Sequence, residues 1–190
     1  MLEDSKQIVV VGAGIGGLTT ALCLKHFGLN ASVYERSNEV TTAGAGIQLS
    51  PNANRVFSYL GLFDEVSALS RRCKGIKVFD YKSKSQLALF DYMKFKQDAA
   101  FLFCHRADLV GILYAACKKL KIPVHFDKKL ENIKNGEVIF SDGNVYSADI
   151  IVGADGLHSN VRKALFDEET PIFTRQIAWR SIVPNSINQD

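Results

Sequence analysis

The sequence predicts an α/β fold with a central parallel sheet, and three observations carry this prediction. Residues 7–11 (QIVVV) form a continuous β-branched run, which is typical of a strand buried on both faces. A glycine turn and a segment with helical apolar spacing follow this run, and residues 31–34 (ASVY) form a second predicted strand. A strand, a helix and a strand within about 30 residues make a βαβ unit, whose strands are parallel and whose crossover is right-handed.

Further helices and strands extend this pattern. Ser50 and Pro51 predict the start of a helix, with Ser50 as the N-cap, Gly61 at its end, and one apolar face made of Ala53, Val56, Phe57 and Leu60. Residues 106–120 predict a second helix whose buried stripe is Leu109, Ile112, Leu113, Ala116 and Leu120. The short apolar runs at 123–126 and 149–152 predict further strands of the parallel sheet.

Antiparallel elements interrupt the βα order. Residues 75–92 contain two short strands around the polar turn 82–85, which predicts an inserted hairpin. Asp142-Gly143 lies between the apolar runs 137–140 and 145–148, and an Asp-Gly turn in that setting is a strong hairpin signal. The run at 176–183 (QIAWRSIV) predicts a strand that begins a second sheet.

The charge of the chain is nearly balanced, with 23 Lys and Arg residues against 20 Asp and Glu residues and a formal net charge of +3. A balance this even does not predict a nucleic-acid partner. No apolar run approaches the roughly 20 residues of a membrane span, and the acidic, polar start is unlike a signal peptide. Cys23, Cys73, Cys104 and Cys117 show no Cys-x-x-Cys pair and no clustered histidines, so we expect no metal site, reduced thiols and a cytoplasmic location.

A glycine turn follows the first strand with the spacing Gly12-x-Gly14-x-x-Gly17. The spacing alone is weak, but a predicted buried strand precedes it and a predicted helix follows, which is the context of a dinucleotide site. Gly12 allows the tight turn, Gly14 lets the backbone approach a pyrophosphate, and Gly17 lets the helix pack closely on the strand. The phosphates are then expected at the helix N-terminus, where free N–H groups and the helix dipole favour anions.

Glu35 ends the second predicted strand, 18 residues after Gly17. A carboxylate there can accept hydrogen bonds from both ribose hydroxyls of an adenosine and would repel a 2′-phosphate, which favours FAD or NAD over NADP. The alternative, a glycine-rich turn beside a surface glutamate, is disfavoured by the strand–turn–helix–strand context. The start of the chain is therefore predicted to be Rossmann-like.

Three other segments separate FAD from NAD by resemblance. They read GAGIQLSPNA at 44–53, HRADL at 105–109 and, most specifically, DIIVGADGLHSNVR at 149–162. Together they resemble the single-component flavoprotein aromatic hydroxylases of the salicylate- and para-hydroxybenzoate-hydroxylase type. The match runs through nearly the whole chain in the family's order, and it implies FAD as the cofactor with NAD(P)H as co-substrate.

The resemblance implies a set of residues around each part of FAD. The set at the adenosine and phosphates is Gly12, Ala13, Gly14 and Gly17 at the pyrophosphate, Glu35 at the ribose and Arg36 at the adenine end. The set toward the flavin half is Gly44, Ala45 and Gly46, with Arg106 reaching toward the phosphate and ribitol. Asp155 and Gly156 belong to the motif that the family uses for both FAD and reduced nicotinamide.

Several of these residues also have a purely structural interpretation. Arg106 could be a solvated residue in the first turn of its helix, and Gly44 and Gly46 could serve only as flexible loop positions. Asp155-Gly156 could be only a strand-ending turn, and Arg162 could stack on its helix end or pair with Asp155.

Arg180 lies where relatives often place an arginine that faces the substrate or the flavin, which makes it the one candidate catalytic residue. An arginine paired with a neighbouring acid in the strand is an equal alternative. Trp179 alternates with Arg180 along the predicted strand and is expected to pack into the core.

The activity implied by the resemblance is FAD-dependent hydroxylation of a small aromatic substrate. NAD(P)H would reduce the flavin, and O2 would then form a flavin C4a-hydroperoxide that transfers one oxygen atom to the ring. Two alternatives stay open: a flavin-dependent epoxidase or dehydrogenase on the same scaffold, and a non-catalytic FAD-binding fragment.

The 190 residues are expected to be the N-terminal part of a longer protein and to be inactive alone, because the family's downstream Gly-Asp motif is missing. The predicted organisation is an FAD-binding part over 1–74, a hairpin over 75–100 toward the substrate layer, a second FAD-binding part over 101–170, and the start of a truncated substrate-binding sheet over 171–190. The expected partners are a small aromatic substrate and O2, with no nucleic acid and no membrane span; a homodimer is left open.

Overall fold

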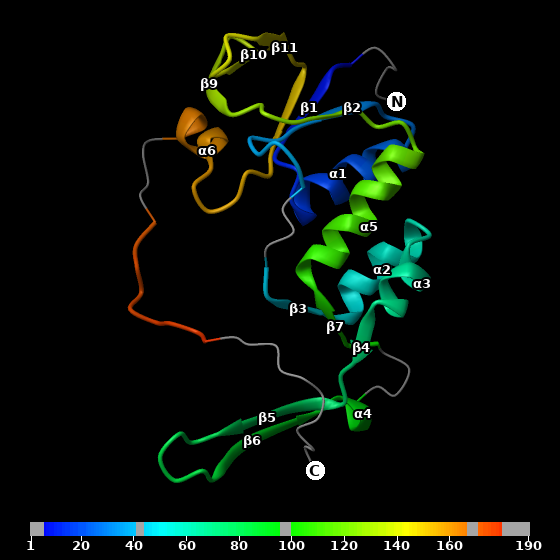
Figure 1. Cartoon of the computed structure of the whole chain (residues 1–190), viewed down its shortest axis with the longest axis vertical. Helices are drawn as coiled ribbons and strands as arrows, with labels where there is room; N and C mark the ends of the chain where they lie inside the picture. Colours follow the sequence, from blue (N-terminus) through cyan, green and yellow to red (C-terminus); the bar gives the residue numbers. More distant parts are fainter. Residues whose placement is uncertain (1–5, 41–43, 96–99, 167–170, 180–190) are drawn as a thin grey trace. The chain divides into compact units, whose positions relative to one another are not determined.

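The structure is a computed structural model that describes residues 6–40, 44–95, 100–166 and 171–179 (Figure 1). Contacts between Cα atoms divide the chain into two compact units. Among the described residues, the first unit comprises 6–40, 109–166 and 171–179, and the second comprises 44–95 and 100–108.

A four-stranded parallel sheet forms the centre of the first unit. Across the sheet, the strands are β12 (Ile150–Gly153), β1 (Ile8–Val11), β2 (Ala31–Tyr34) and β8 (Val124–His125). Every neighbouring pair is parallel, and Val10 of β1 lies opposite Val152 and Val33. β1 is buried along its whole length, as its β-branched run predicts. The predicted α/β class and central parallel sheet are confirmed.

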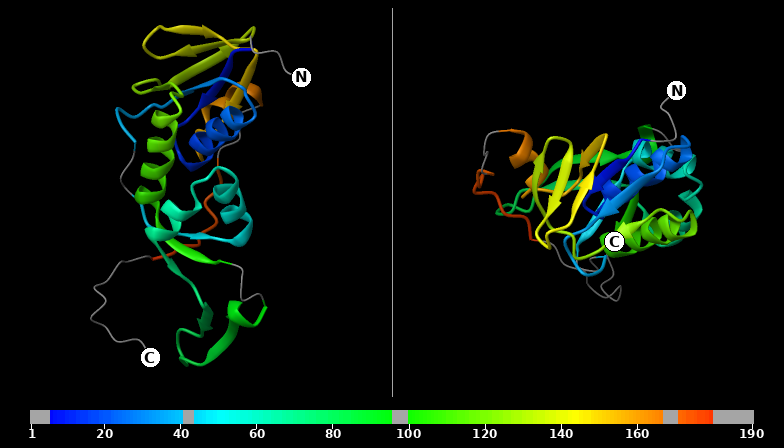
Figure 2. Two further views of the ribbon diagram at one scale, coloured as in Figure 1. Left: turned by 90° about the vertical axis from the view of Figure 1, so that its right-hand side faces the viewer. Right: turned by 90° about the horizontal axis from the view of Figure 1, so that it is seen from above.

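Two helices lie on one side of this sheet, with β1 and β2 between them and a further sheet (Figure 2). α1 (Ile15–His26) follows β1, and Gly28 takes a φ of 78° just beyond its end, a conformation that glycine adopts readily. α5 (Arg106–Lys119) contributes its residues from Leu109 onward to this unit. The thiol of Cys117 in α5 reaches the carbonyl oxygen of Leu18 in α1 at 3.8 Å, so the two helices touch.

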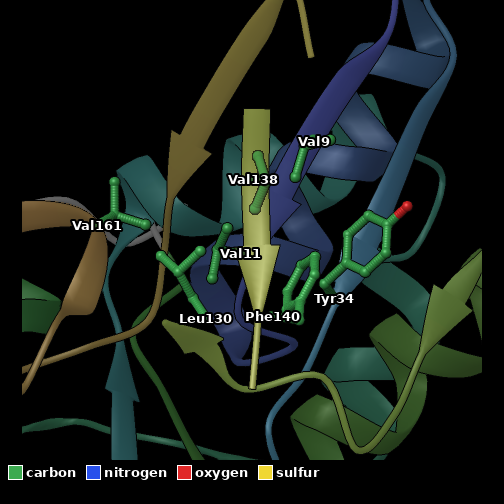
Figure 3. Packing of buried hydrophobic residues seen from close by; sticks show 7 residues of the cluster. All are labelled: Val9, Val11, Tyr34, Leu130, Val138, Phe140 and Val161. Carbon is green, nitrogen blue, oxygen red and sulfur yellow. The ribbon is translucent and has the colours of Figure 1, made fainter. Parts of the chain in front are cut away.

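A three-stranded antiparallel sheet covers the other face. It is made of β9 (Leu130–Lys134), β10 (Glu137–Phe140) and β11 (Val145–Ser147), with β10 in the middle. One buried cluster joins the two sheets (Figure 3), and its members are Val9, Val11, Tyr34, Leu130, Val138, Phe140 and Val161. The rings of Tyr34 and Phe140 stack with their centroids 4.9 Å apart. Burial of one such valine or phenylalanine contributes about 1.5–3 kcal/mol, so this cluster is a main source of the unit's stability.

The hairpin predicted at Asp142-Gly143 is confirmed as β10 and β11, whereas β9 has no counterpart among the predicted elements. A local signal for β9 was present in the sequence. Asn135 and Gly136 have φ angles of 53° and 77° and connect Lys134 to Glu137, which pair across the two strands. Positive φ at both residues of a two-residue loop is the type I′ turn that Asn-Gly favours.

The last described part of the first unit contains α6 (Asn160–Leu165) and residues 171–179. The strand predicted over 176–183 is wrong for 176–179, which form neither helix nor strand, and the rest lies outside the described residues. The prediction that Trp179 packs into the core is also wrong, because its side chain is 94% exposed. Without a strand at this position, no sheet brings the indole against the core.

The second unit contains a small antiparallel sheet, two helices and a hairpin. The sheet has the order β3 (Gly46–Leu49), β7 (Leu102–His105), β4 (Ser70–Arg72), and the helices are α2 (Pro51–Tyr59) and α3 (Phe63–Ala68). The inserted hairpin is confirmed as β5 (Gly75–Phe79) and β6 (Gln86–Asp91), and the short α4 (Tyr92–Phe95) follows it.

The predicted N-cap of α2 is confirmed, and two other details of the helix predictions are wrong. Ser50 occupies the N-cap of α2, but its hydroxyl bonds to Asn52 Oδ1 instead of a backbone N–H. Val56 is exposed, and Asn54 is buried in its place because its amide donates to the carbonyl oxygen of Ala100 at 2.6 Å. Leu120 is exposed because α5 ends at Lys119.

Cys117 gives the first unit a predicted sensitivity to alkaline pH. Its side chain is fully buried, and this burial raises the pKa of the thiol from 9.0 to about 11. The unfolded chain loses this proton at lower pH than the folded chain, so the free energy of unfolding should fall as the pH rises from about 9 to about 11.

Urea unfolding at several pH values compares the protein with its Cys117→Ala variant. The variant should be less stable at pH 7, because it leaves a small cavity, and it should lose less stability between pH 9 and 11. Equal losses in the two proteins would show that the Cys117 thiol does not cause the alkaline sensitivity.

Candidate dinucleotide site

The turn between β1 and α1 is closely packed at two of its glycines. A β-carbon on Gly17 would lie 1.8 Å from the carbonyl oxygen of Gly12, a distance that no side chain can occupy. A β-carbon on Gly12 would lie 2.5 Å from the carbonyl oxygen of Ala154, and the φ of Gly12 is 105°. Gly12 and Gly17 are therefore required by the fold itself, because they let α1 and the end of β12 approach the turn.

Gly14 is different, because nothing lies within 4 Å of the place where its β-carbon would stand. It is the N-cap of α1, with φ −76° and ψ −175°, and no side chain caps this helix end. The first turn of α1 carries no acidic residue either. An uncapped helix N-terminus offers backbone N–H groups and the positive end of the helix dipole, and the space before Gly14 lets an anion approach them.

Glu35 lies directly after β2 and is bonded to this same turn. Its Oε2 accepts a hydrogen bond from the backbone N–H of Ala13 at 2.7 Å, and its Oε1 accepts one from the N–H of Ser37 at 2.9 Å. A carboxylate has about four acceptor positions, so both oxygens can still accept from ribose hydroxyls. Arg36, next in the chain, is exposed.

Asp155 holds the turn after β12 to the start of α6. Its Oδ1 accepts from the Ser159 hydroxyl at 2.5 Å, and its Oδ2 accepts from the backbone N–H of Asn160 at 2.6 Å and of Val161 at 3.2 Å. Ser159 in turn caps the helix by accepting from the N–H of Arg162 at 3.0 Å. Asp155 thus has a structural role, because its carboxylate holds the first residues of α6. A carboxylate at a helix N-terminus also interacts favourably with the helix dipole.

Arg162 does not pair with Asp155. Its Nη2 donates to the carbonyl oxygen of Leu157 at 2.7 Å, which closes the turn from the other side. Gly156 takes a φ of 80°, which glycine adopts without strain. The motif Asp155-Gly156 with Ser159 and Arg162 therefore folds as one hydrogen-bonded unit.

A cavity of about 530 Å³ lies between the glycine turn and this motif. Its lining includes Gly16 and Thr20 of α1, Asp155 and Gly156 of the turn, and Arg162. Thr20 and Arg162 were not among the predicted cofactor residues. Helical spacing from Gly16 would have pointed to Thr20, whose hydroxyl donates to the Gly16 carbonyl at 2.8 Å.

The remaining predicted residues belong to the second unit. A β-carbon on Gly44 would lie 2.9 Å from Cβ of Arg106, and the N–H of Arg106 donates to the carbonyl oxygen of Ala45 at 3.3 Å. Gly46 pairs with His105 across β3 and β7. These four residues are thus neighbours, whereas Arg180 lies outside the described residues.

No three His, Cys, Asp or Glu side chains gather into a metal site within the described part of the chain. Across those same residues, no helix is both long enough and apolar enough to cross a membrane. The cysteines, all four within the described ranges, are free of disulfides.

The fold and the site define a dinucleotide-binding α/β protein. The chain matches the family model described as FAD binding domain over residues 5–188, so it belongs to that family. The open approach at Gly14, the uncapped end of α1 and the acceptor oxygens of Glu35 fit the pyrophosphate and ribose of FAD. NAD carries the same pyrophosphate and ribose, so it is the family match that identifies FAD as the cofactor of this site.

Curated relatives agree with the resemblance to FAD-dependent aromatic hydroxylases. 6-hydroxynicotinate 3-monooxygenase of Bordetella bronchiseptica is 30% identical over 194 residues, covering 98% of this chain and 50% of that protein. 3-amino-4-hydroxybenzoate 2-monooxygenase of Streptomyces cremeus is 33% identical over 195 residues, covering 98% of this chain and 48% of that protein. The resemblance is confirmed, and the chain spans about half the length of the curated relatives it matches.

The solved structure of 2-methyl-3-hydroxypyridine-5-carboxylic acid oxygenase, in its tetrameric form, is similar in fold. The TM-score is 0.76 at 27% sequence identity, and the match covers 86% of this chain and 43% of that one.

The glycines give a prediction that separates folding from binding. Gly17→Ala should lower the free energy of unfolding by about 2–3 kcal/mol, because the turn must open to admit the methyl group. Gly14→Ala should lower the free energy of unfolding by less, about 0.5–1 kcal/mol, because alanine is a poorer N-cap than glycine. It should bind FAD about tenfold more weakly, because the methyl group fills the approach to the helix amides.

Urea unfolding and FAD titration measure the two effects. Gly111→Ala is the control for binding, because its β-carbon would also meet open space, and alanine inside α5 should raise the free energy of unfolding by about 0.5–1 kcal/mol. If Gly14→Ala binds FAD as the wild type does, the phosphates do not lie against this glycine.

Asp155→Ala should lower the free energy of unfolding by about 1–2 kcal/mol, the usual cost of losing a helix cap. Glu39→Ala removes an exposed acid from the loop after β2 and should cost less, which makes it a control. Thermal or urea unfolding measures both variants, and an equal loss in the two would contradict the capping role of Asp155.

Proposed function

We propose that this chain is the FAD-binding part of a monooxygenase that hydroxylates a small aromatic substrate with NAD(P)H and O2. The observation that carries the proposal is the glycine turn with Glu35 bonded to it, in a chain whose relatives are named as monooxygenases of hydroxylated aromatic acids. The proposal concerns the activity of a whole protein, because relatives of this kind are about twice as long as this chain.

In this proposal, the residues of the first unit bind the adenosine and the phosphates of FAD. In this proposal, Gly12, Ala13, Gly14 and Gly17 surround the pyrophosphate at the N-terminus of α1. Helix amides offer neutral donors that stay in place whether or not an anion is bound, so little rearrangement accompanies binding. Glu35 accepts from the ribose hydroxyls, and Arg36, which is exposed, lies at the adenine end.

Asp155 and Gly156 are proposed to line FAD and reduced nicotinamide through their backbone. The Asp155 carboxylate is occupied by Ser159, Asn160 and Val161, so it positions the turn instead of pointing freely at a ligand. The turn borders the cavity of about 530 Å³ that Arg162 also lines. An arginine there supplies positive charge for a nucleotide phosphate.

The residues of the second unit are proposed for the flavin half of the cofactor. Gly44, Ala45 and Gly46 present backbone groups, and the close packing of Gly44 on Arg106 supports a joint role for this segment and that side chain. Arg180 is the proposed residue facing the substrate or flavin. When bound, FAD supplies the redox chemistry, and the protein's own groups bind, orient and shield it from water.

The domain boundaries at residues 74, 100 and 170, a cytoplasmic location and self-association also belong to this proposal. Free cysteines support a reducing compartment. A homodimer stays a prediction, and the similar solved structure is described as a tetrameric form.

The experiment that tests the function measures NAD(P)H oxidation by the protein with FAD, in air, against a panel of hydroxylated aromatic acids. Faster NAD(P)H oxidation together with a product heavier by one oxygen atom would support the proposal. Oxidation with no oxygen in the product would favour a dehydrogenase, and an epoxide would favour an epoxidase.

Glu35→Gln should weaken FAD binding by about 1.5–3 kcal/mol, because the amide loses the charge that strengthens the ribose hydrogen bonds. Fluorescence titration with FAD measures the change, and Glu39→Gln, an exposed acid in the following loop, is the control. Unchanged affinity in Glu35→Gln would show that the ribose does not bind at this carboxylate.

A further inference from the structure

A second pocket, of about 540 Å³, lies in the first unit at the edge of the parallel sheet away from the glycine turn. Its lining includes Ile8 and Ala31, the first residues of β1 and β2, and Pro123, which precedes β8. In a parallel sheet the amino ends of the strands share one edge and the carboxyl ends share the other. Gly12 and Glu35 follow the carboxyl ends, so this pocket is separate from the dinucleotide site.

Three lysines line this pocket, which we call the lysine pocket. Lys6 precedes β1, Lys25 lies in the last turn of α1, and Lys121 follows α5. No Asp or Glu is among its described lining residues. Asp149 lies close by, but its Oδ2 accepts from the backbone N–H of Gln7 at 2.7 Å. Three lysines thus line the pocket, and the one carboxylate named beside it, that of Asp149, contacts the backbone of the lining residue Gln7.

Lys121 ends α5 in a left-handed backbone conformation. Lys121 has a φ of 55°, and the N–H of Ile122 donates to the carbonyl oxygen of Cys117 at 2.9 Å. This is the helix-ending motif in which glycine is the usual residue at the left-handed position, because a side chain there costs conformational energy. Lys84 is left-handed too, so Lys121 is distinguished by its place in the lining of the pocket and not by its backbone conformation.

Helix dipoles do not account for the whole cluster. The negative end of α1 favours a cation in its last turn, which explains Lys25. Lys6 belongs to no helix, so the same reason does not apply to it. The Lys25 ammonium donates to Asn30 Oδ1 at 2.9 Å, which leaves two of its three N–H donors for a ligand.

The other side of the lysine pocket is suited to an organic group. Tyr146 lines it and is half-buried, and its ring packs on the buried Tyr34 ring with centroids 5.0 Å apart. Ser147, which is exposed, adds a hydroxyl donor. A volume of about 540 Å³ far exceeds one phosphate ion and lies in the range of small-molecule sites.

We propose that the lysine pocket binds a small phosphorylated organic molecule. The phosphate lies among the side chains of Lys6, Lys25 and Lys121, and the organic part lies against Tyr146, which is half-buried. A doubly charged phosphate matches three ammonium groups better than a single carboxylate does, and ammonium groups bind phosphate as point charges.

Isothermal titration calorimetry with phenyl phosphate tests the proposal on protein saturated with FAD, which blocks the pyrophosphate site. Phenyl phosphate should bind more tightly than inorganic phosphate, and phenol should not bind. Lys6→Gln and Lys25→Gln should each lower the affinity about tenfold, the usual effect of losing one charged hydrogen bond.

Two variants separate binding from folding. Lys121→Gly should unfold at a higher urea concentration than the wild type, because glycine suits the left-handed position. Despite this higher stability, the variant should bind phenyl phosphate about tenfold more weakly than the wild type. Lys84→Gly is the matched control, because Lys84 is also left-handed (φ 59°) but lies in the β5–β6 turn of the other unit, and the affinity of this variant should equal that of the wild type.

Two results would overturn the proposal: no phenyl phosphate binding to the FAD-saturated protein, or binding that none of the three lysine substitutions weakens. Should the protein fail to bind FAD at all, the same titrations on the FAD-free protein still decide the matter through the lysine variants. A failure of the proposed function and a failure of the proposal for the lysine pocket therefore give different experimental results.

Discussion

The close meeting of α1, β1 and β12 at Gly12 and Gly17 is the constraint on which the rest of the first unit depends. Neither position has room for a β-carbon, since the nearest backbone oxygens would lie 2.5 Å and 1.8 Å away. This contact presses the start of α1 against the carboxyl edge of the sheet. The uncapped helix end, Glu35 and the turn at Asp155 consequently all stand at one edge, where dinucleotides bind in such folds.

Two acidic residues serve the fold and the site together. Glu35 ties β2 to the glycine turn through the N–H of Ala13, and Asp155 ties the end of β12 to α6. Both carboxylates are held by backbone donors, so the turns they fix are preorganised for a ligand. At the opposite edge of the sheet, three lysines line one pocket: Lys6, Lys25 and Lys121.

The parallel sheet, α1, α5 and the two hairpins could be predicted because local patterns specify them: β-branched runs, helical spacing, the polar turn at 82–85 and the Asp-Gly turn at 142–143. β3 and β7 could not be predicted, because more than 50 residues separate them and no single tight turn connects them. Some of their positions are exposed, so their sequences do not form a continuous apolar run. The glycine turn and Glu35 were readable for the same local reason. The capping role of Asp155 was not, because a turn motif in sequence does not say which donors its carboxylate meets.

The most direct test of the central claim compares FAD with FMN as ligands of the purified protein by fluorescence titration. FMN carries the flavin but lacks the second phosphate and the adenosine that the α1 N-terminus and Glu35 are positioned to hold. The account predicts that FAD binds at least about a hundredfold more tightly than FMN, which corresponds to about 2.7 kcal/mol. Equal affinities would contradict it, because the glycine turn would then contribute nothing to cofactor binding.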